Sequence, residues 1–289
     1  MSDDDMLIGE ARLAFLDVET TGLFPAMGDR IVEIGIVICR GTQETGRLSR
    51  LVNPERLIPT EAQQVHGISD QDVADCPPFS IVADEMCNAL RDTWIVGHNV
   101  RFDIGFVAME IVSGGHHVTP LGCLDTCQLA AALWDLPNYQ LDTVVAALAL
   151  GSNQPHRALG DAELARAVFH RAVEELGGWP DVTLADLQAL HSYVPAWPDD
   201  PRQGLPGPLF DALTNGGELS IGYINSDGQQ SARTICPVAC FPAGRYTYVR
   251  AHCNKTGELR TFRIDRMVLE RWAGLAVQPV EGFKSDAAS

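Results

Sequence analysis

Two acidic residues follow an apolar segment near the start of the chain, in the tripeptide Asp17-Val18-Glu19. The segment Arg12–Val18 is rich in strand-forming residues, and alternate residues of a strand share a face. Both carboxylates are therefore expected to point the same way, and a divalent cation would remove their mutual repulsion. Hard oxygen ligands favour magnesium or manganese. The alternative is a solvated strand end with two unrelated acids.

Two later segments carry further candidates. Asp103 lies in GHNVRFDIGF, in the first turn of a helix that follows a strand, where the helix dipole favours an anion. In HRALGDAELA, His156 precedes a predicted helix and Asp161 lies in its first turn. Taken singly, these residues are typical of helix-start acids and a surface histidine. Taken together, they place four carboxylates and one histidine in three separate segments.

This set of residue types predicts phosphoryl chemistry. Two divalent cations roughly 3.5–4 Å apart form a clamp for in-line displacement at phosphorus. A histidine with an ordinary pKa of roughly 6.5 is suited to take a proton from an attacking water at neutral pH. Four carboxylates suffice to bind two cations, and His156 is the best-placed base.

The segments LDVETTG, GHNVRFD and HRALGDA, in this order, resemble the three motifs of the histidine (DEDDh) subgroup of the DEDD exonuclease superfamily. The connecting segments NPERLIPTEAQQVHGISD and LDTCQLAAAL fit the same family, so that the resemblance covers residues 10–176. It implies an RNase H-like α/β fold and a metal-dependent 3'→5' exonuclease that releases nucleoside monophosphates from single-stranded or 3'-ended DNA, or from RNA.

The resemblance also implies roles for single residues. The metal ligands, for two Mg²⁺ or Mn²⁺ ions, would be Asp17, Glu19, Asp103 and Asp161, with His156 as general base. The residues that match positions holding the terminal nucleotide are Thr20, Thr21, Gly22, Leu23, His66, Asn99 and Phe102. The structural alternatives are that Leu23 and Phe102 belong to the core and that Asn99 caps the following helix.

The elements that must position these residues follow from the apolar pattern. Three strands, Arg12–Val18, Ile31–Cys39 and Arg47–Val52, predict an antiparallel meander. Helices and short strands then alternate, which predicts a mixed sheet flanked by helices. The later elements are expected at Ser80–Arg91, Trp94–Gly97, Phe102–Ser113, near Leu124, and at Tyr139–Leu150 and Gly160–Leu176.

The rest of the chain has a different character. We predict an exonuclease domain over residues 1–178 and a short helix, Thr183–His191, with a proline-rich linker over 179–211. A small all-β domain is expected over 212–289, with strands near Glu218–Asn225, Gln230–Cys236, Arg245–Cys253 and Glu258–Ile264.

This last segment resembles a WYL domain, a small SH3- or Sm-like β-barrel found in bacterial regulators. Tyr248 and Val249 match the naming tripeptide, whose tryptophan position holds Thr247. A nucleic acid or nucleotide ligand would use an aromatic side chain for stacking and arginines for phosphate. The predicted ligand-binding residues are Tyr248, Arg260, Arg263 and Arg266. The alternative is that these arginines pair with the acidic first domain.

The net charge of -17 argues, taken alone, against a polyanionic partner. Residues 1–178 hold 26 acids and 11 bases, whereas residues 212–289 hold seven acids and nine bases. Four of the acids in the first segment are predicted metal ligands, and bound cations would offset their charge. The global charge therefore does not exclude a nucleic-acid substrate.

The amino-acid composition limits the class of protein to which the chain can belong. With 46% hydrophobic and 20% charged residues, no apolar run near 18 residues and an acidic start, we expect a cytoplasmic protein without a membrane segment. The eight cysteines are expected to be reduced. A zinc site from Cys236, Cys240, His252 and Cys253 is an alternative. The competing functions are an RNA 3'-end trimming enzyme and a catalytically weak WYL sensor or binding protein.

Overall fold

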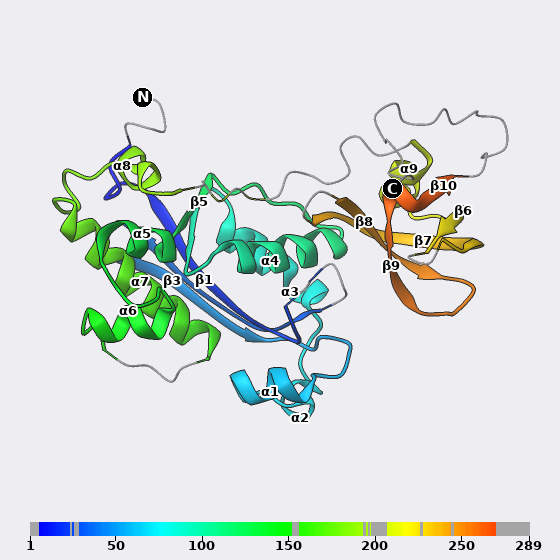
Figure 1. Ribbon diagram of the computed structural model, residues 1–289, viewed down its shortest axis with the longest axis horizontal. Helices are drawn as coiled ribbons and strands as arrows, with labels where there is room; N and C mark the ends of the chain where they lie inside the picture. Colours follow the sequence, from blue (N-terminus) through cyan, green and yellow to red (C-terminus); the bar gives the residue numbers. More distant parts are fainter. Residues whose placement is uncertain are drawn as a thin grey trace. The chain divides into compact units, whose positions relative to one another are not determined.

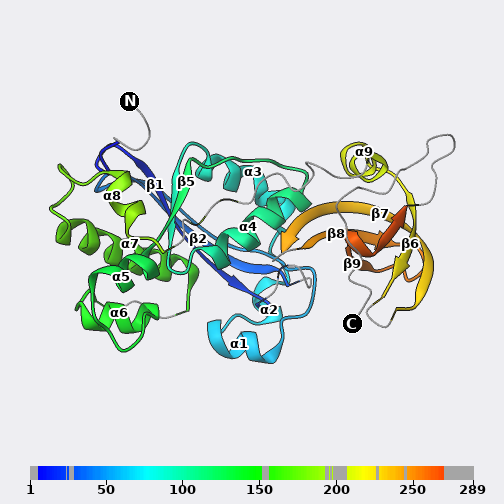
Figure 2. The same ribbon diagram turned by 45° about the horizontal axis from the view of Figure 1, so that its top comes forward.

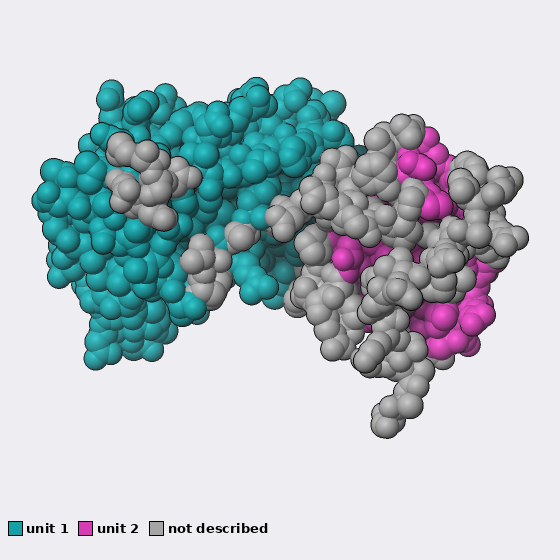
Figure 3. Space-filling model, turned by 90° about the horizontal axis from the view of Figure 1, so that it is seen from above, with its two compact units in different colours: residues 1–25, 29–197 teal, residues 26–28, 198–289 magenta. Residues whose placement is uncertain are grey.

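The computed structural model describes residues 6–23, 25, 29–151, 156–192, 195, 197, 207–225, 228–243 and 246–269. The chain divides into two compact units (Figure 3), one of Met1–Pro25 with Asp29–Trp197 and one of Ala26–Gly28 with Pro198–Ser289. The cut after Trp197 falls inside the predicted linker, whose residues 198–206 lie outside the described part. The domain boundaries at 178 and 211 stay a prediction.

The first unit is built on a five-stranded mixed sheet in the order β3-β2-β1-β4-β5 (Figure 1). Strand β1 pairs antiparallel with β2, and β2 with β3, whereas β1–β4 and β4–β5 are parallel. The predicted meander and the mixed sheet are confirmed. The strands are β1 (Arg12–Thr20), β2 (Ile31–Arg40), β3 (Gln43–Leu51), β4 (Trp94–Gly97) and β5 (Gly122–Asp125).

Helices cover both faces of this sheet (Figures 1 and 2). The residues of α3 and α4 pack on one face, and those of α5, α7 and α8 on the other. The helices of this unit are α1 (Thr60–His66), α2 (Asp70–Val73), α3 (Phe79–Leu90), α4 (Arg101–Ser113), α5 (Thr126–Leu133), α6 (Leu141–Ala147), α7 (Ala158–Glu175) and α8 (Leu184–Ala189). None of the described helices combines the length and apolar character that crossing a bilayer requires.

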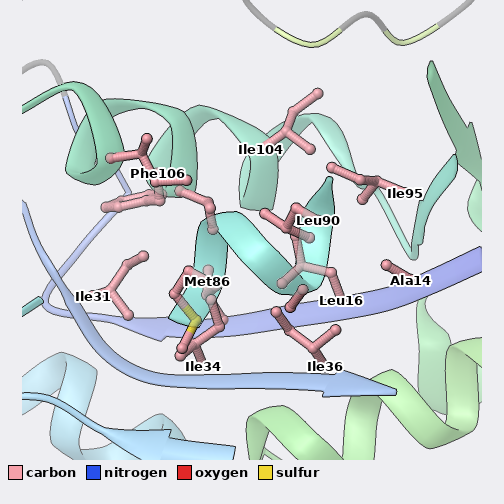
Figure 4. Close-up of a cluster of buried hydrophobic side chains, with 14 of the residues drawn as sticks. Ala14, Leu16, Ile31, Ile34, Ile36, Met86, Leu90, Ile95, Ile104 and Phe106 are labelled. Atoms are coloured by element: carbon pink, nitrogen blue, oxygen red, sulfur yellow. The ribbon is translucent and has the colours of Figure 1, made fainter. Parts of the chain in front are cut away.

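Alternation along β1 assigns each of its residues to one face of the sheet. Ala14 and Leu16 join the buried cluster under α3 and α4, which Figure 4 shows with Ile34 and Phe106. Leu13 and Phe15 join the cluster under α7, where Phe15 makes an edge-on contact with Phe169. Because the period of a strand is two, Asp17 and Glu19 continue the row of Leu13 and Phe15 on the α7 side.

The second unit contains a five-stranded antiparallel sheet in the order β10-β6-β7-β8-β9, preceded by α9 (Gly207–Asn215). The edge strands β9 and β10 are joined by the three-residue 3-10 helix η3 (Ile264–Arg266), so the sheet must curl until its edges approach each other. A contact between Tyr223 on β6 and Phe262 on β9, with ring centroids 5.1 Å apart, agrees with this curvature. The predicted small all-β fold is confirmed. Its strands are β6 (Leu219–Ile224), β7 (Gln230–Ala243), β8 (Tyr246–Cys253), β9 (Leu259–Arg263) and β10 (Met267–Leu269).

Several elements differ from the sequence prediction. Helices α1, α2, α5 and α9 and strand β10 were not predicted, and α6 is shorter than expected. Strand β7 continues past Cys236, where we expected it to end, because a bulge between Pro237 and Ala239 accommodates the missing donor of the proline. Helix α8 is capped as expected, since the Thr183 side chain accepts a hydrogen bond from the Asp186 backbone N–H.

Candidate metal centre and nucleotide site

Three carboxylates converge where β1 meets the start of α7. One carboxylate oxygen each from Asp17, Glu19 and Asp161 lies within 4.8 Å of the other two. Asp17 and Glu19 share the α7 face of β1, and Asp161 lies in the first turn of α7. Among the described residues, these three carboxylates are the one set of at least three potential metal ligands that lie this close together.

Asp103 approaches the same place from α4. Strand β4 pairs with β1 only as far as Phe15, which leaves the later backbone of β1 free for other partners. The buried Asp103 carboxylate accepts a hydrogen bond of 3.1 Å from the Val18 N–H, between the two β1 acids. The structure thus places the fourth predicted ligand beside the other three, although it does not belong to the 4.8 Å group.

The electrostatics of the cluster reflect burial and mutual repulsion. Burial and the nearby carboxylates of Asp103 and Asp161 raise the pKa of Asp17 well above its ordinary value. Burial and Asp161 raise the pKa of Glu19 to about 8, and burial raises that of Asp161 to about 6. Burial also raises the pKa of Asp103, against the effect of the Val18 N–H. A cation would favour the ionised form of each of these groups.

His156 precedes α7 by two residues and is exposed. Its φ of 61° lies in the left-handed region, which is uncommon for a residue other than glycine. Its backbone forms a hydrogen bond to the Asp161 carboxylate that lowers the pKa of that group. His156 is therefore held next to one of the clustered acids while its side chain faces solvent.

The turn after β1 is fixed by internal hydrogen bonds. The Thr20 hydroxyl donates to the Gly22 carbonyl at 2.6 Å, and the Thr21 hydroxyl accepts from the Arg30 N–H at 3.0 Å. Both threonines are buried, so their side chains hold the turn. Leu23 is 68% exposed, which excludes the alternative that it is a core residue.

The other predicted nucleotide-site residues have different surroundings. His66 is buried, and its Nδ1 accepts the Ile68 N–H at 3.0 Å, which leaves the proton of the neutral ring on Nε2. Asn99 is exposed with a φ of 63°, and α4 is preceded by Val100 without a side-chain cap, so the capping alternative for Asn99 is wrong. Phe102 is half-buried against Phe106, with ring centroids 5.0 Å apart.

Four charged residues that support the site were not singled out from the sequence. Glu33 on β2 is buried and pairs with Arg157, at 2.6 Å between Oε1 and Nη2. Arg30, which binds the Thr21 turn, is buried and donates to Glu110 on α4 at 2.8 Å. The signal for Glu33 was its place inside the apolar run IVEIGIVI, where an acid requires a partner.

In the second unit, strand register separates the predicted ligand-binding residues. Tyr248 lies opposite Arg263 and is stacked on Phe241, with ring centroids 5.8 Å apart and an interplanar angle of 9°. Arg260 lies opposite Ala251, on the other face of the sheet, and Arg266 lies in η3. The structure therefore brings Tyr248 and Arg263 together but not Arg260 with them. Arg250, two residues from Tyr248 and buried, was missed by the sequence analysis.

The alternative zinc site does not form. Cys240 and Cys253 lie in the apolar core of the second unit, while Cys236 pairs in register with the exposed His252. No three of these four residues form a ligand group in the described part of the chain. Cys236, Cys240 and Cys253 form no disulfide bond, and the core gives Cys240 and Cys253 apolar neighbours.

Two family models match separate segments of the chain. A family model described as Exonuclease (RNase_T) matches residues 14–169, and a model of the WYL domain matches residues 207–269. The first of these matches spans more than half of the chain and contains all the clustered carboxylates.

Three curated relatives are each 36% identical. They are the 3'-5' exonuclease DinG of Bacillus subtilis over 187 residues, a PolC-type DNA polymerase III of Thermotoga maritima over 193, and a DNA polymerase III subunit epsilon of Rickettsia conorii over 174. They match 64%, 66% and 58% of this chain. The chain spans only 20% and 14% of the first two proteins but 74% of the third.

Two solved structures align with this chain, one of them with a TM-score above 0.5. The zinc-bound form of Escherichia coli ExoI with single-stranded DNA aligns with a TM-score of 0.53 at 18% identity, covering 83% of this chain and 54% of that one. Exonuclease X in complex with 5' overhanging duplex DNA aligns with a TM-score of 0.49 at 27% identity, covering 62% and 98%.

Proposed function

Because the chain belongs to the exonuclease family, we propose that it is a metal-dependent 3'→5' exonuclease that hydrolyses DNA, or RNA, to nucleoside monophosphates. The observation that carries the proposal is the convergence of the Asp17, Glu19 and Asp161 oxygens within 4.8 Å, with the buried Asp103 beside them. Such a concentration of acids is costly in the interior of a protein unless it serves to bind cations.

The donor set fits hard divalent cations. All four side chains offer carboxylate oxygens, which suit Mg²⁺ or Mn²⁺, and burial together with nearby carboxylates raises their pKa values. We propose that Asp17, Glu19, Asp103 and Asp161 hold two such ions. When bound, the ions offset the acidic charge, acidify the attacking water and stabilise charge on the phosphate and the leaving oxygen.

His156 is proposed to take the proton of the attacking water. The water oxygen bonds to the terminal phosphorus, the bond from phosphorus to the 3' oxygen of the preceding nucleotide breaks, and that oxygen gains a proton. His156 suits this role because it is exposed to solvent beside Asp161 and held there by its own backbone.

The terminal nucleotide is proposed to bind at the turn after β1. The exposed apolar side chain of Leu23 offers a surface for a base, and the backbone of Thr20, Thr21 and Gly22 offers polar groups to the sugar. The residues proposed to complete this site are His66, Asn99 and Phe102.

The second unit is proposed to bind single-stranded nucleic acid or a nucleotide ligand through the Tyr248 ring, which is stacked on the buried Phe241, and the adjacent Arg263. Aromatic rings accept bases of any sequence by stacking, and arginine pairs with phosphate. The two rings lie opposite each other on neighbouring strands, and Arg263 lies opposite Tyr248.

The deciding experiment follows the release of a 3' label from DNA and RNA oligonucleotides of the same sequence, with Mg²⁺ or Mn²⁺. We expect the parent protein and the exposed-surface control Glu85→Gln to release labelled nucleoside monophosphate, and Asp17→Ala and His156→Ala to be strongly impaired. Faster release from RNA would favour an exoribonuclease that trims 3' ends. Binding without turnover by the parent protein would exclude the exonuclease and favour a binding protein.

A further inference from the structure

An ion pair joins a buried acid near the start of β2 to the residue before α7. Glu33 has a side-chain exposure of 2%, and the register places it opposite another acid, Glu19 on β1. Its partner is Arg157, which donates from Nε to Oε2 at 2.9 Å and from Nη2 to Oε1 at 2.6 Å. Such a two-bond arrangement fixes direction as well as distance.

Glu33 also caps α7. No side chain of its own segment caps this helix, but Glu33 Oε2 accepts the Ala158 N–H at 3.1 Å. A carboxylate at a helix N-terminus satisfies a backbone donor and interacts favourably with the helix dipole. A single carboxylate on β2 therefore binds both the residue after His156 and the first residue of the helix that carries Asp161.

The backbone of β2 brings the helix still closer. A Cβ atom on Gly35 would lie 2.2 Å from the Leu159 nitrogen, so the first turn of α7 rests directly on this glycine. Gly35 lies opposite Asp17, as Glu33 lies opposite Glu19. The two β2 residues that hold α7 are thus the strand neighbours of the two β1 acids.

From these contacts we propose that Glu33 and Arg157 are positioning residues of the nuclease site. The pair holds the segment 156–161 on β2, so that Asp161 reaches Asp17 and Glu19 and His156 stays beside them. The inference rests on the proposed exonuclease function for its kinetic part only. It differs from a substrate-binding role for Arg157, whose side chain is 45% exposed and contacts Glu33 with Nε and Nη2.

The first test measures amide hydrogen exchange in the metal-free protein, in peptides that cover residues 156–161. Glu33→Ala removes the partner of Arg157 and of the Ala158 N–H, so we expect exchange there to become about 10-fold faster or more. Glu33→Gln keeps an acceptor for the Ala158 N–H, so its exchange rate should lie between those of the parent and of Glu33→Ala. The matched control is Arg50→Gln, which breaks an exposed two-bond pair with Glu85 and should leave residues 156–161 unchanged.

The second test is kinetic. We expect Glu33→Ala, Arg157→Ala and the double variant to lower kcat by similar factors of about 10–100, because each breaks the same unit and the losses do not add. KM for a short oligonucleotide should change little, and Arg157→Lys should restore part of kcat.

Two results would overturn the proposal. One is unchanged exchange over residues 156–161 in Glu33→Ala. The other is a rise in KM confined to the Arg157 variants, which would make Arg157 a substrate contact. If the parent protein cleaves no oligonucleotide, the proposed exonuclease fails, but the exchange experiment still decides whether the pair holds this segment.

Discussion

The two units differ in the charged residues that they bury. In the first, acids lie in the interior between sheet and helices, and Glu33 and Asp103 are almost completely buried. In the second, the core cluster consists of apolar side chains, Arg250 is the buried charged residue among those described, and Arg260 and Arg263 lie on opposite faces of β9. The first unit therefore carries a cost that bound cations would remove, whereas the second has an apolar core that requires no ligand.

This difference predicts that substitutions in the first unit change the rate of hydrolysis, whereas substitutions in the second unit change the affinity for a ligand. Changing a clustered acid in the first unit alters the groups that would hold the metal, so the rate of hydrolysis should respond strongly. Changing a strand-face residue in the second unit removes one contact to a flexible ligand and should alter binding by a modest factor.

The largest effect is expected from Asp17→Asn. The substitution keeps the size of the side chain but replaces one carboxylate oxygen at the centre of the cluster with an amide nitrogen, which removes the negative charge. We therefore expect kcat to fall by about 10³-fold or more. The measurement is single-turnover release of a 3'-terminal nucleotide at saturating Mn²⁺. The thermal midpoint should not fall, because one of the mutually repelling charges is removed. A loss below about 10-fold would remove the contrast between the units.

His156→Ala should have the next largest effect. Loss of the proposed base is expected to lower kcat by about 10²–10³-fold, without changing the metal concentration at half-maximal rate. His117→Ala is the matched control, since this histidine is exposed and its Nε2 forms a hydrogen bond with the Thr119 hydroxyl. Equal activity of the His156→Ala variant and the parent would assign proton transfer to another group.

The sequence predicted the three acids that converge because each belongs to a short segment with its own signal. Alternation along β1 places Asp17 and Glu19 on one face, and the start of α7 follows from its apolar period. The support by Glu33 and Arg157 was not predictable in this way. These residues are 124 positions apart, and only the packing of α7 on β2 brings them together.

In the second unit, the sequence predicts the position of some arginines but not of others. Arg260 and Arg263 are three positions apart on one strand, so alternation alone already places them on opposite faces. The place of Arg250 relative to β7 depends on the bulge between Pro237 and Ala239, which nothing in the sequence locates. Helix α9 was missed because Pro208 was assigned to the linker, although proline is tolerated in the first turn of a helix.

A smaller effect is expected from Tyr248→Ala. Loss of one stacking surface should weaken binding of a long single strand by about 10-fold, as measured by fluorescence anisotropy with a catalytically inactive background variant. The rate on a dinucleotide, which is too short to reach a second site, should not change. Arg260→Ala, on the opposite face of β9, serves as the control and should bind as the parent does.

The same experiment can contradict the proposal that the second unit contributes to binding and not to the reaction. If Arg260→Ala weakened binding as much as Tyr248→Ala, the ligand would contact both faces of the strand or neither. A loss of dinucleotide turnover in Tyr248→Ala would mean that the second unit takes part in the chemistry, and the separation of rate from affinity would be wrong.

The smallest expected effect concerns stability and pH. Glu19 has a folded-state pKa of about 8 against an ordinary 4.5, so the folded protein binds this proton more tightly than the unfolded chain does. The associated stability is fully present below pH 4.5 and is lost as the pH rises through about 8. Asp161, with a pKa of about 6, acts in the same direction. The metal-free first unit should therefore lose stability between pH 5 and pH 8.

Glu19→Gln isolates this contribution, because it removes the titrating group. In the presence of a chelator, we expect the variant to melt about 3 °C higher than the parent at pH 8 and at nearly the same temperature at pH 5. Excess Mn²⁺ should reverse the order at pH 8, since the parent keeps a ligand that the variant has lost. If the difference between variant and parent did not grow with pH, the burial and mutual repulsion of the clustered acids would not be what distinguishes the first unit from the second.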